Sequence, residues 1–132
     1  MEPGKGNGEG GRMTTKICMR FGETTVQAEL NDTDTAQVFA SKLPTTIRVS
    51  GTGIDFCGRM PFGLPYEESQ VGRGWTNGDV NYNPGGGWFA LLFDDEENSS
   101  RYGDQVNMGR VVGPLDMLHE LSGSYDLVIE RA

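Results

Sequence analysis

Cysteine and histidine are scarce in this chain, and their scarcity excludes several kinds of site. The 132 residues contain two cysteines, Cys18 and Cys57, and one histidine, His119. Two cysteines are too few for a disulfide framework, and they lack the C-x-x-C spacing of metal ligands. With no second histidine or cysteine beside it, His119 is expected at the surface, outside any metal site or catalytic triad. We therefore predict no metal, no cofactor and two free thiols that are buried or half-buried.

Long apolar runs and an excess of basic residues are also missing. The longest apolar run, residues 88–93, has the length of a buried strand, whereas a bilayer span needs about 20 residues. The N-terminus lacks the charged-then-apolar layout of a secretory signal, so a cytoplasmic location is expected. A formal net charge of -8 argues against nucleic acid as a partner and disfavours anionic membranes.

The composition of the chain is typical of one small folded domain, and its first residues are typical of a tail. Hydrophobic residues make up 36% of the chain and charged residues 23%. Residues 1–12, MEPGKGNGEGGR, cannot bury enough apolar area to order themselves, so we expect a flexible tail followed by one domain over residues 13–132. No strand precedes these glycines and no helix follows them, which excludes a dinucleotide-binding loop. The chain also lacks G-x-S-x-G and Walker motifs.

Alternating apolar and polar residues predict about eight short strands. The run at residues 88–93 is apolar on both faces, so it is expected at the centre of the sheet. The strands are expected near residues 17–21, 26–30, 47–49, 54–60, 79–82, 88–93, 106–108, 110–112 and 125–129.

Two short helices are expected between the strands. The first follows Asn31, Asp32 or Thr33, any of which can cap it, carries apolar residues at i, i+3, i+4 and i+7 from Ala36, and ends before Pro44. The second spans residues 115–121. Turn signals at this spacing are typical of a barrel or sandwich, and we predict a mainly β, closed barrel with these two helices over its openings.

Two segments are expected to be irregular. Residues 61–77 are rich in glycine, proline and aromatic residues, and such a loop in a compact domain is functional or disordered. The acidic segment at residues 94–100 begins with four consecutive carboxylates, which point in divergent directions. A solvated turn is therefore expected there, without a bound cation.

The segment GDVNYNPGGGWFALLF, residues 78–93, followed by MGRVVGPLDMLHEL, residues 108–121, resembles small bacterial and archaeal cyclophilin-like proteins of unassigned function. The resemblance covers most of residues 15–131 and implies the closed cyclophilin-like barrel. Prolyl cis/trans isomerisation is the activity of cyclophilins. In them an arginine donates to the prolyl nitrogen and weakens the amide resonance behind a barrier of about 18–20 kcal/mol.

The chain departs from the cyclophilin pattern where proline would bind. Arg59 is the candidate arginine, but the Gln-Gly-Gly-Asp run that follows in cyclophilins is missing. Aligned on Gly109, the family's pocket histidine falls on Gln105 and its ligand-contacting tryptophan on Ser100. The resemblance therefore implies the fold more strongly than the activity.

Two interpretations of the aromatic loop stay open. Met60, Phe62, Tyr66 and Trp75 could line a groove with Arg59 at its mouth, or they could pin the loop over the barrel. Arg59 could likewise anchor a ligand carboxylate or carbonyl, or brace the loop by bonding backbone carbonyls.

From these features we predict a monomer or weak homodimer that acts as a non-enzymatic module binding a peptide or a small molecule. The predicted ligand-binding residues are Arg59, Met60, Phe62, Trp75 and Gln105. The alternative is a weak peptidyl-prolyl isomerase that uses Arg59.

Overall fold

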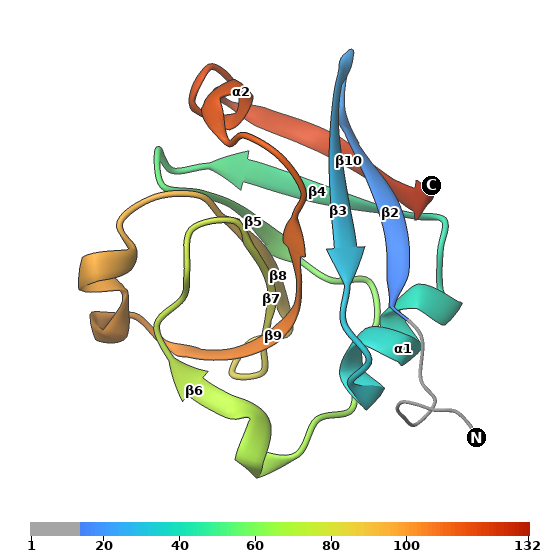
Figure 1. Ribbon diagram of the computed structural model, residues 1–132, viewed down its shortest axis with the longest axis vertical. Helices are drawn as coiled ribbons and strands as arrows, with labels where there is room; N and C mark the ends of the chain where they lie inside the picture. The colour runs from blue at the N-terminus through green and yellow to red at the C-terminus, as the bar shows by residue number, and fades with distance from the viewer. Residues whose placement is uncertain (1–13) are drawn as a thin grey trace.

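The computed structural model describes residues 14–132, which form a closed antiparallel β-barrel (Figure 1). The predicted tail, residues 1–12, and Met13 lie outside the described residues. The elements are β2 (Thr15–Phe21), β3 (Thr24–Leu30), α1 (Asp34–Ser41), β4 (Thr45–Gly51), β5 (Asp55–Arg59), β6 (Val71–Arg73), β7 (Asp79–Asn83), β8 (Trp88–Leu92), β9 (Asp104–Val111), α2 (Asp116–His119) and β10 (Ser124–Arg131).

Eight of the described strands make the barrel, in the order β3, β2, β10, β4, β5, β8, β7 and β9. Pairing of β3 with β9 closes the circle, and β6 is an extra strand that pairs with β9. The predicted fold class, a mainly β closed barrel of about eight strands, is therefore confirmed. Strand β8 lies between β5 and β7, and its outward as well as its inward side chains are mostly buried.

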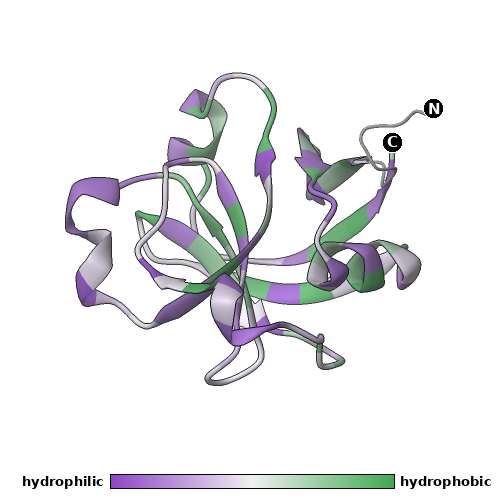
Figure 2. Ribbon diagram, turned by 60° about the horizontal axis from the view of Figure 1, so that its bottom comes forward, coloured by the Kyte–Doolittle hydropathy of each residue, from purple (hydrophilic) through white to green (hydrophobic). Residues whose placement is uncertain are grey.

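The alternation seen in the sequence places one face of each strand in the core. Figure 2 shows the strands banded with hydrophobic and hydrophilic residues along their length. Inward residues such as Ile17, Met19 and Leu127 have no exposed surface. Rings from three strands meet inside: Phe21 lies 5.0 Å from Phe56, centroid to centroid, and Phe56 lies 5.8 Å from Phe93 at the end of β8. Burial of this apolar area is the main force that closes the barrel.

Strand β9 corrects the prediction of two strands around Gly109. It runs without a break from Asp104 to Val111, and Gly109 lies inside it, opposite Leu30 of β3. A Cβ added to Gly109 would lie 2.2 Å from the carbonyl oxygen of Glu29. The glycine that indicated a bend is instead the position where two strands approach too closely for any side chain.

Each helix contributes to the core. Thr33 caps α1 by accepting a hydrogen bond from the Ala36 amide at 3.2 Å, and the predicted first helix is confirmed. Phe39 of α1 and Leu118 of α2 are fully buried, and the two helices lie at opposite ends of the barrel in Figure 1. The second helix is shorter than predicted, Asp116–His119 in place of residues 115–121.

The two segments predicted as irregular contain short ordered elements. Within residues 61–77 a 3₁₀ helix, Glu68–Gln70, leads into β6. A second 3₁₀ helix, Glu96–Arg101, occupies most of the acidic segment. Arg73 connects β6 to the end of this second 3₁₀ helix, since its guanidinium donates to the carbonyl oxygens of Ser100 at 3.1 Å and Tyr102 at 2.7 Å. In residues 14–132 no helix is long and apolar enough to cross a membrane.

Candidate functional site

A cleft of about 650 Å³ lies on the outer wall of the barrel, over β5, β8 and β7. Its floor consists of outward side chains in register across β5 and β8: Cys57 faces Ala90, and Asp55 faces Leu92. The residues between them on β8, Phe89 and Leu91, point into the core. Outward strand residues are usually polar, so the apolar floor needs a cover.

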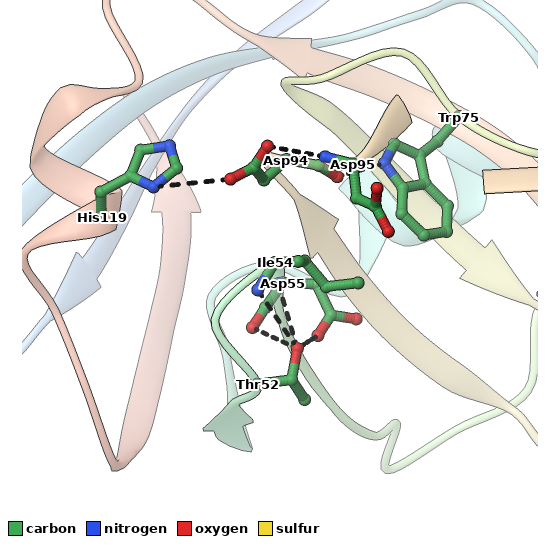
Figure 3. A network of polar contacts seen from close by, with 7 residues as sticks. All are labelled: Thr52, Ile54, Asp55, Trp75, Asp94, Asp95 and His119. Atoms are coloured by element: carbon green, nitrogen blue, oxygen red, sulfur yellow. Dashed lines mark hydrogen bonds and ion pairs between the residues drawn. The ribbon is translucent and has the colours of Figure 1, made fainter. Parts of the chain in front are cut away.

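Trp75 provides part of that cover. Its side chain packs on Ala90 and Leu92 and is 8% exposed. Figure 3 shows the indole beside Asp94, whose carbonyl oxygen accepts a hydrogen bond from Nε1 at 2.9 Å. The backbone N–H of Trp75 donates to the hydroxyl of Ser99 at 2.9 Å. Trp75 is therefore held at its backbone and at its ring nitrogen.

Two further aromatic side chains line the cleft and are partly open to solvent. Trp88, at the start of β8, is 38% exposed, and Tyr102, beside β9, is 40% exposed. The ring of Tyr102 lies 5.3 Å from that of Trp75, centroid to centroid. Three aromatic rings around an apolar floor form the kind of surface that small ligands bury.

The acid and the thiol on the floor affect each other's protonation. Thr52 donates its hydroxyl to Oδ1 of Asp55 at 2.5 Å. Burial raises the pKa of Asp55, and hydrogen bonds from Thr52 and Cys57 oppose that shift. Burial, together with the charge of Asp55 and its hydrogen bond, raises the pKa of Cys57 to about 11. At neutral pH this thiol is protonated and is a poor nucleophile.

A chain of side-chain amides fixes Gln105 at one edge of the cleft. The Asn81 Nδ2 donates to Oε1 of Gln105 at 3.0 Å, and the Asn107 Nδ2 donates to Oδ1 of Asn81 at 2.9 Å. Asn31 extends the chain, because its Nδ2 lies 3.1 Å from Oδ1 of Asn107. Asn81 is 1% exposed and Gln105 is 8% exposed, so these amides depend on one another for partners.

The structure separates the five predicted ligand-binding residues into two groups. Trp75 and Gln105 line the cleft, and Arg59 lies beside it, with its guanidinium carbon 5.4 Å from the ring centroid of Trp88. Met60 is 7% exposed and belongs to the core, and Phe62 packs against the same core. The side chain of Arg59 points outward and that of Met60 inward because successive residues of an extended chain face opposite sides.

Other residues of the cleft were missed from the sequence, and one signal pointed to them. The missed residues with chemical character are Asp55, Cys57, Trp88, Asp95 and Tyr102. The signal was the run of residues 88–93: a strand that is apolar on both faces has an outer face that must be covered or must line a hollow. That reasoning identifies β8 and its neighbours, whereas the aromatic loop alone does not.

His119 is at the surface, as predicted. Its side chain is 46% exposed, and Nδ1 lies 3.9 Å from Oδ2 of Asp94 (Figure 3). Both cysteines are free and half-buried, which is confirmed as well. Within residues 14–132 no three side chains of His, Cys, Asp or Glu gather in a way that could hold a metal ion.

The fold and the site together define a small β-barrel protein with an apolar cleft on its outer wall. The profile of the Cyclophilin-like family matches residues 19–130, and the chain belongs to this family. No curated protein matches the chain. A hypothetical protein from Archaeoglobus fulgidus, known from a solution structure, is 22% identical, with 96% of this chain and 100% of that one covered and a TM-score of 0.75. This likeness shows the fold alone.

Proposed function

We propose that this protein is a non-enzymatic binding module that takes a small molecule or a short peptide in the outer cleft. The observation that carries the proposal is the apolar lining of the cleft, in which the exposed rings of Trp88 and Tyr102 stand beside the buried cluster of Trp75, Ala90 and Leu92. A volume of about 650 Å³ lies within the range of ligand pockets, about 300–1,000 Å³.

The fixed positions of the lining residues support binding. The indole of Trp75 and the amide of Gln105 are each held by hydrogen bonds within the chain. Because these side chains are already ordered, a ligand loses less of its binding free energy to ordering the protein. Their polar groups are occupied, so the surface that they offer is largely apolar.

The chemistry of the floor supports binding without catalysis. Cys57, the thiol in the cleft, has its pKa raised to about 11, which opposes a role as nucleophile. His119, the histidine of the chain, does not line the cleft. Two free thiols also agree with the predicted cytoplasmic location, which stays a prediction, as does the monomer or weak homodimer.

Both tryptophans of the chain, Trp75 and Trp88, line the cleft, so intrinsic tryptophan fluorescence reports on it directly. We expect a screen of small aromatic compounds and short peptides to find ligands that change this fluorescence and raise Tm. In ¹⁵N spectra the two indole N–H signals should shift before any signal from β2 or β10. No change of either indole signal with any compound at millimolar concentration would refute the binding proposal.

Substitutions at two equally exposed side chains give a matched control. Trp88→Ala removes a ring that is 38% exposed in the cleft and should weaken binding of every ligand found. Met117→Ala removes a side chain of α2 that is 37% exposed and does not line the cleft, and should leave binding unchanged. Equal loss in both variants would mean that binding does not depend on the cleft.

Weak prolyl isomerase activity is the second candidate, and the position of Arg59 favours it. This residue lies on the outer side of β5 next to Trp88, so its guanidinium can reach a peptide seated on the floor. A protease-coupled assay on a proline tetrapeptide should then show catalysis that Arg59→Ala removes. Arg59→Lys keeps the charge but loses the planar fork, and should retain little activity. A rate equal to buffer in the wild-type protein would eliminate this candidate.

A further inference from the structure

The acid groups of the cleft have no basic partner in the lining. Asp55 and Asp95 both line the cleft, and the lining contains no lysine, arginine or histidine from residues 14–132. Figure 3 shows the two carboxylates together with Trp75. A ligand that enters this cleft therefore meets two carboxylates in the lining, while the guanidinium of Arg59 lies beside the cleft over the ring of Trp88.

The contacts of the two carboxylates leave their charges unneutralised. Oδ1 of Asp55 accepts from the hydroxyl of Thr52, and Oδ1 of Asp95 accepts from the Asn98 amide at 2.8 Å. Both donors are neutral. Among the described residues neither aspartate forms an ion pair. Asp55 also accepts a hydrogen bond from the thiol of Cys57, which is neutral as well.

The aromatic residues of the cleft favour the same kind of ligand. The faces of tryptophan and tyrosine rings carry partial negative charge and attract ammonium and guanidinium groups. Trp88 already shows this preference, since the guanidinium of Arg59 lies over its ring. Trp75 and Tyr102 add two more rings to the lining.

We infer that the cleft takes a small organic ammonium ion, a primary amine carried on an apolar or aromatic group. The inference rests on the proposed binding function and specifies its ligand. The apolar part packs on the exposed rings of Trp88 and Tyr102, and the ammonium group lies toward the carboxylates of the lining. Burial raises the pKa of Asp55, and a cation beside this group opposes that shift. The net charge of -8 attracts cations to the protein as a whole.

Three probes of similar size and different charge test the inference: benzylamine, benzyl alcohol and benzoate. Titrations at fixed ionic strength and neutral pH, followed by tryptophan fluorescence, should rank benzylamine first. A hydrogen-bonded ammonium in a half-buried site should improve Kd by about tenfold over the alcohol. A tripeptide Ala-Lys-Ala with blocked ends carries the same ammonium on a peptide, so its Kd relative to benzylamine distinguishes a free amine from a lysine side chain.

Variants that each remove one negative charge test which carboxylates cause the preference for benzylamine. Asp55→Asn and Asp95→Asn should each reduce the preference for benzylamine over benzyl alcohol by about threefold to fivefold, with little change for the alcohol. Asp126→Asn removes the same charge from an exposed ion pair on β10 and should leave the preference unchanged. If Asp55→Asn does not fold, Asp95→Asn carries the test alone.

The outcomes separate the inference from the proposed function. Binding of all three probes with equal Kd, or a preference for benzoate, overturns the inference and leaves the binding module intact. A preference for benzylamine that Asp126→Asn reduces as much as Asp55→Asn also overturns it, because the attraction would then come from net charge. Absence of binding by every probe overturns the inference, whereas the binding proposal fails only if the wider screen also changes neither indole signal.

Discussion

Replacement of Gly109 by alanine tests how the barrel closes. Gly109 lies opposite Leu30 in the pairing of β9 with β3, which joins the two ends of the eight-stranded circle. An added Cβ would lie 2.2 Å from the carbonyl oxygen of Glu29 and 2.8 Å from the Cα of Leu30. Both atoms belong to backbone, which cannot move aside as a side chain can.

The size of the effect follows from these distances. Non-bonded carbon contacts are comfortable at about 3.5 Å, so the two strands would have to separate by roughly 1 Å. Overpacking costs about 1–3 kcal/mol, and each weakened closing hydrogen bond costs about 1 kcal/mol. Alanine also makes the unfolded chain less flexible than glycine does, which stabilises the folded state by about 0.4–1 kcal/mol. We expect a net loss of about 3 kcal/mol, from a typical total of about 5–15 kcal/mol.

Gly72→Ala is the matched control, because a Cβ added to Gly72 in β6 meets nothing within 4 Å. Urea and thermal unfolding, followed by circular dichroism, should show that Gly72→Ala is as stable as the wild type or slightly more stable. Gly109→Ala should lose about 12 °C in Tm, at about 4 °C for each kcal/mol. If the two variants differ by less than about 0.5 kcal/mol, the usual effect of a surface substitution, closure does not depend on this contact.

Three other predictions concern the amide chain, the thiol and the helix cap. Asn81→Ala should cost about 2 kcal/mol in urea unfolding, because the amides of Gln105 and Asn107 lose a buried partner; an unchanged midpoint would contradict this. Since the pKa of Cys57 is raised to about 11, its alkylation should stay slow through pH 8 and accelerate only as the pH approaches that value. The Cys57→Ser variant leaves Cys18 as the free thiol of the described residues, so the difference in rate between wild type and variant is the alkylation of Cys57. Rapid alkylation of Cys57 at pH 7 would contradict the shift. Thr33→Ala should lower stability by about 1 kcal/mol, and Thr33→Ser should restore it; equal stability of the two would show that the cap contributes nothing.

The helices and strands that could be predicted from the sequence are those that depend on residues close to them in the chain. The helix that begins at Asp34 carries its own cap and its own i, i+3, i+4 pattern, so it needs no other part of the chain to be recognised. The β2–β3 hairpin likewise follows from alternation on both sides of Gly22. For these elements the structure agrees with the prediction.

Elements that depend on distant pairing could not be predicted. Strand β6 has only three residues, Val71–Arg73, and forms because β9 offers it a free edge. Gly109 indicated a bend because its lack of a side chain is visible in the sequence, whereas the nearby backbone of Glu29 is not. A glycine required by close packing and a glycine required by a turn look the same in the sequence.

Only part of the candidate site could be predicted, because its residues too are brought together by distant parts of the chain. Trp75 and Gln105 were identified from the aromatic loop and from the resemblance, and both line the cleft. Met60 was predicted to line a groove with Arg59 at its mouth, but the two residues are adjacent in an extended chain and their side chains face opposite sides, so Met60 is buried. Asp95 could not be placed from the sequence, since the turn that brings it to the cleft is contacted by the indole of Trp75, which donates to the carbonyl oxygen of Asp94 from 19 residues away.

The pairing of β2 with β10 has a consequence for how the protein is made. Ile17 lies opposite Arg131, so a strand near the beginning of the described chain is held by one that leaves the ribosome more than a hundred residues later. Until then β2 has only β3 as a neighbour, and its other edge is open to solvent. The edge of β2 therefore stays unpaired until β10 has been made, and an unpaired strand edge is a place where other chains can pair during folding.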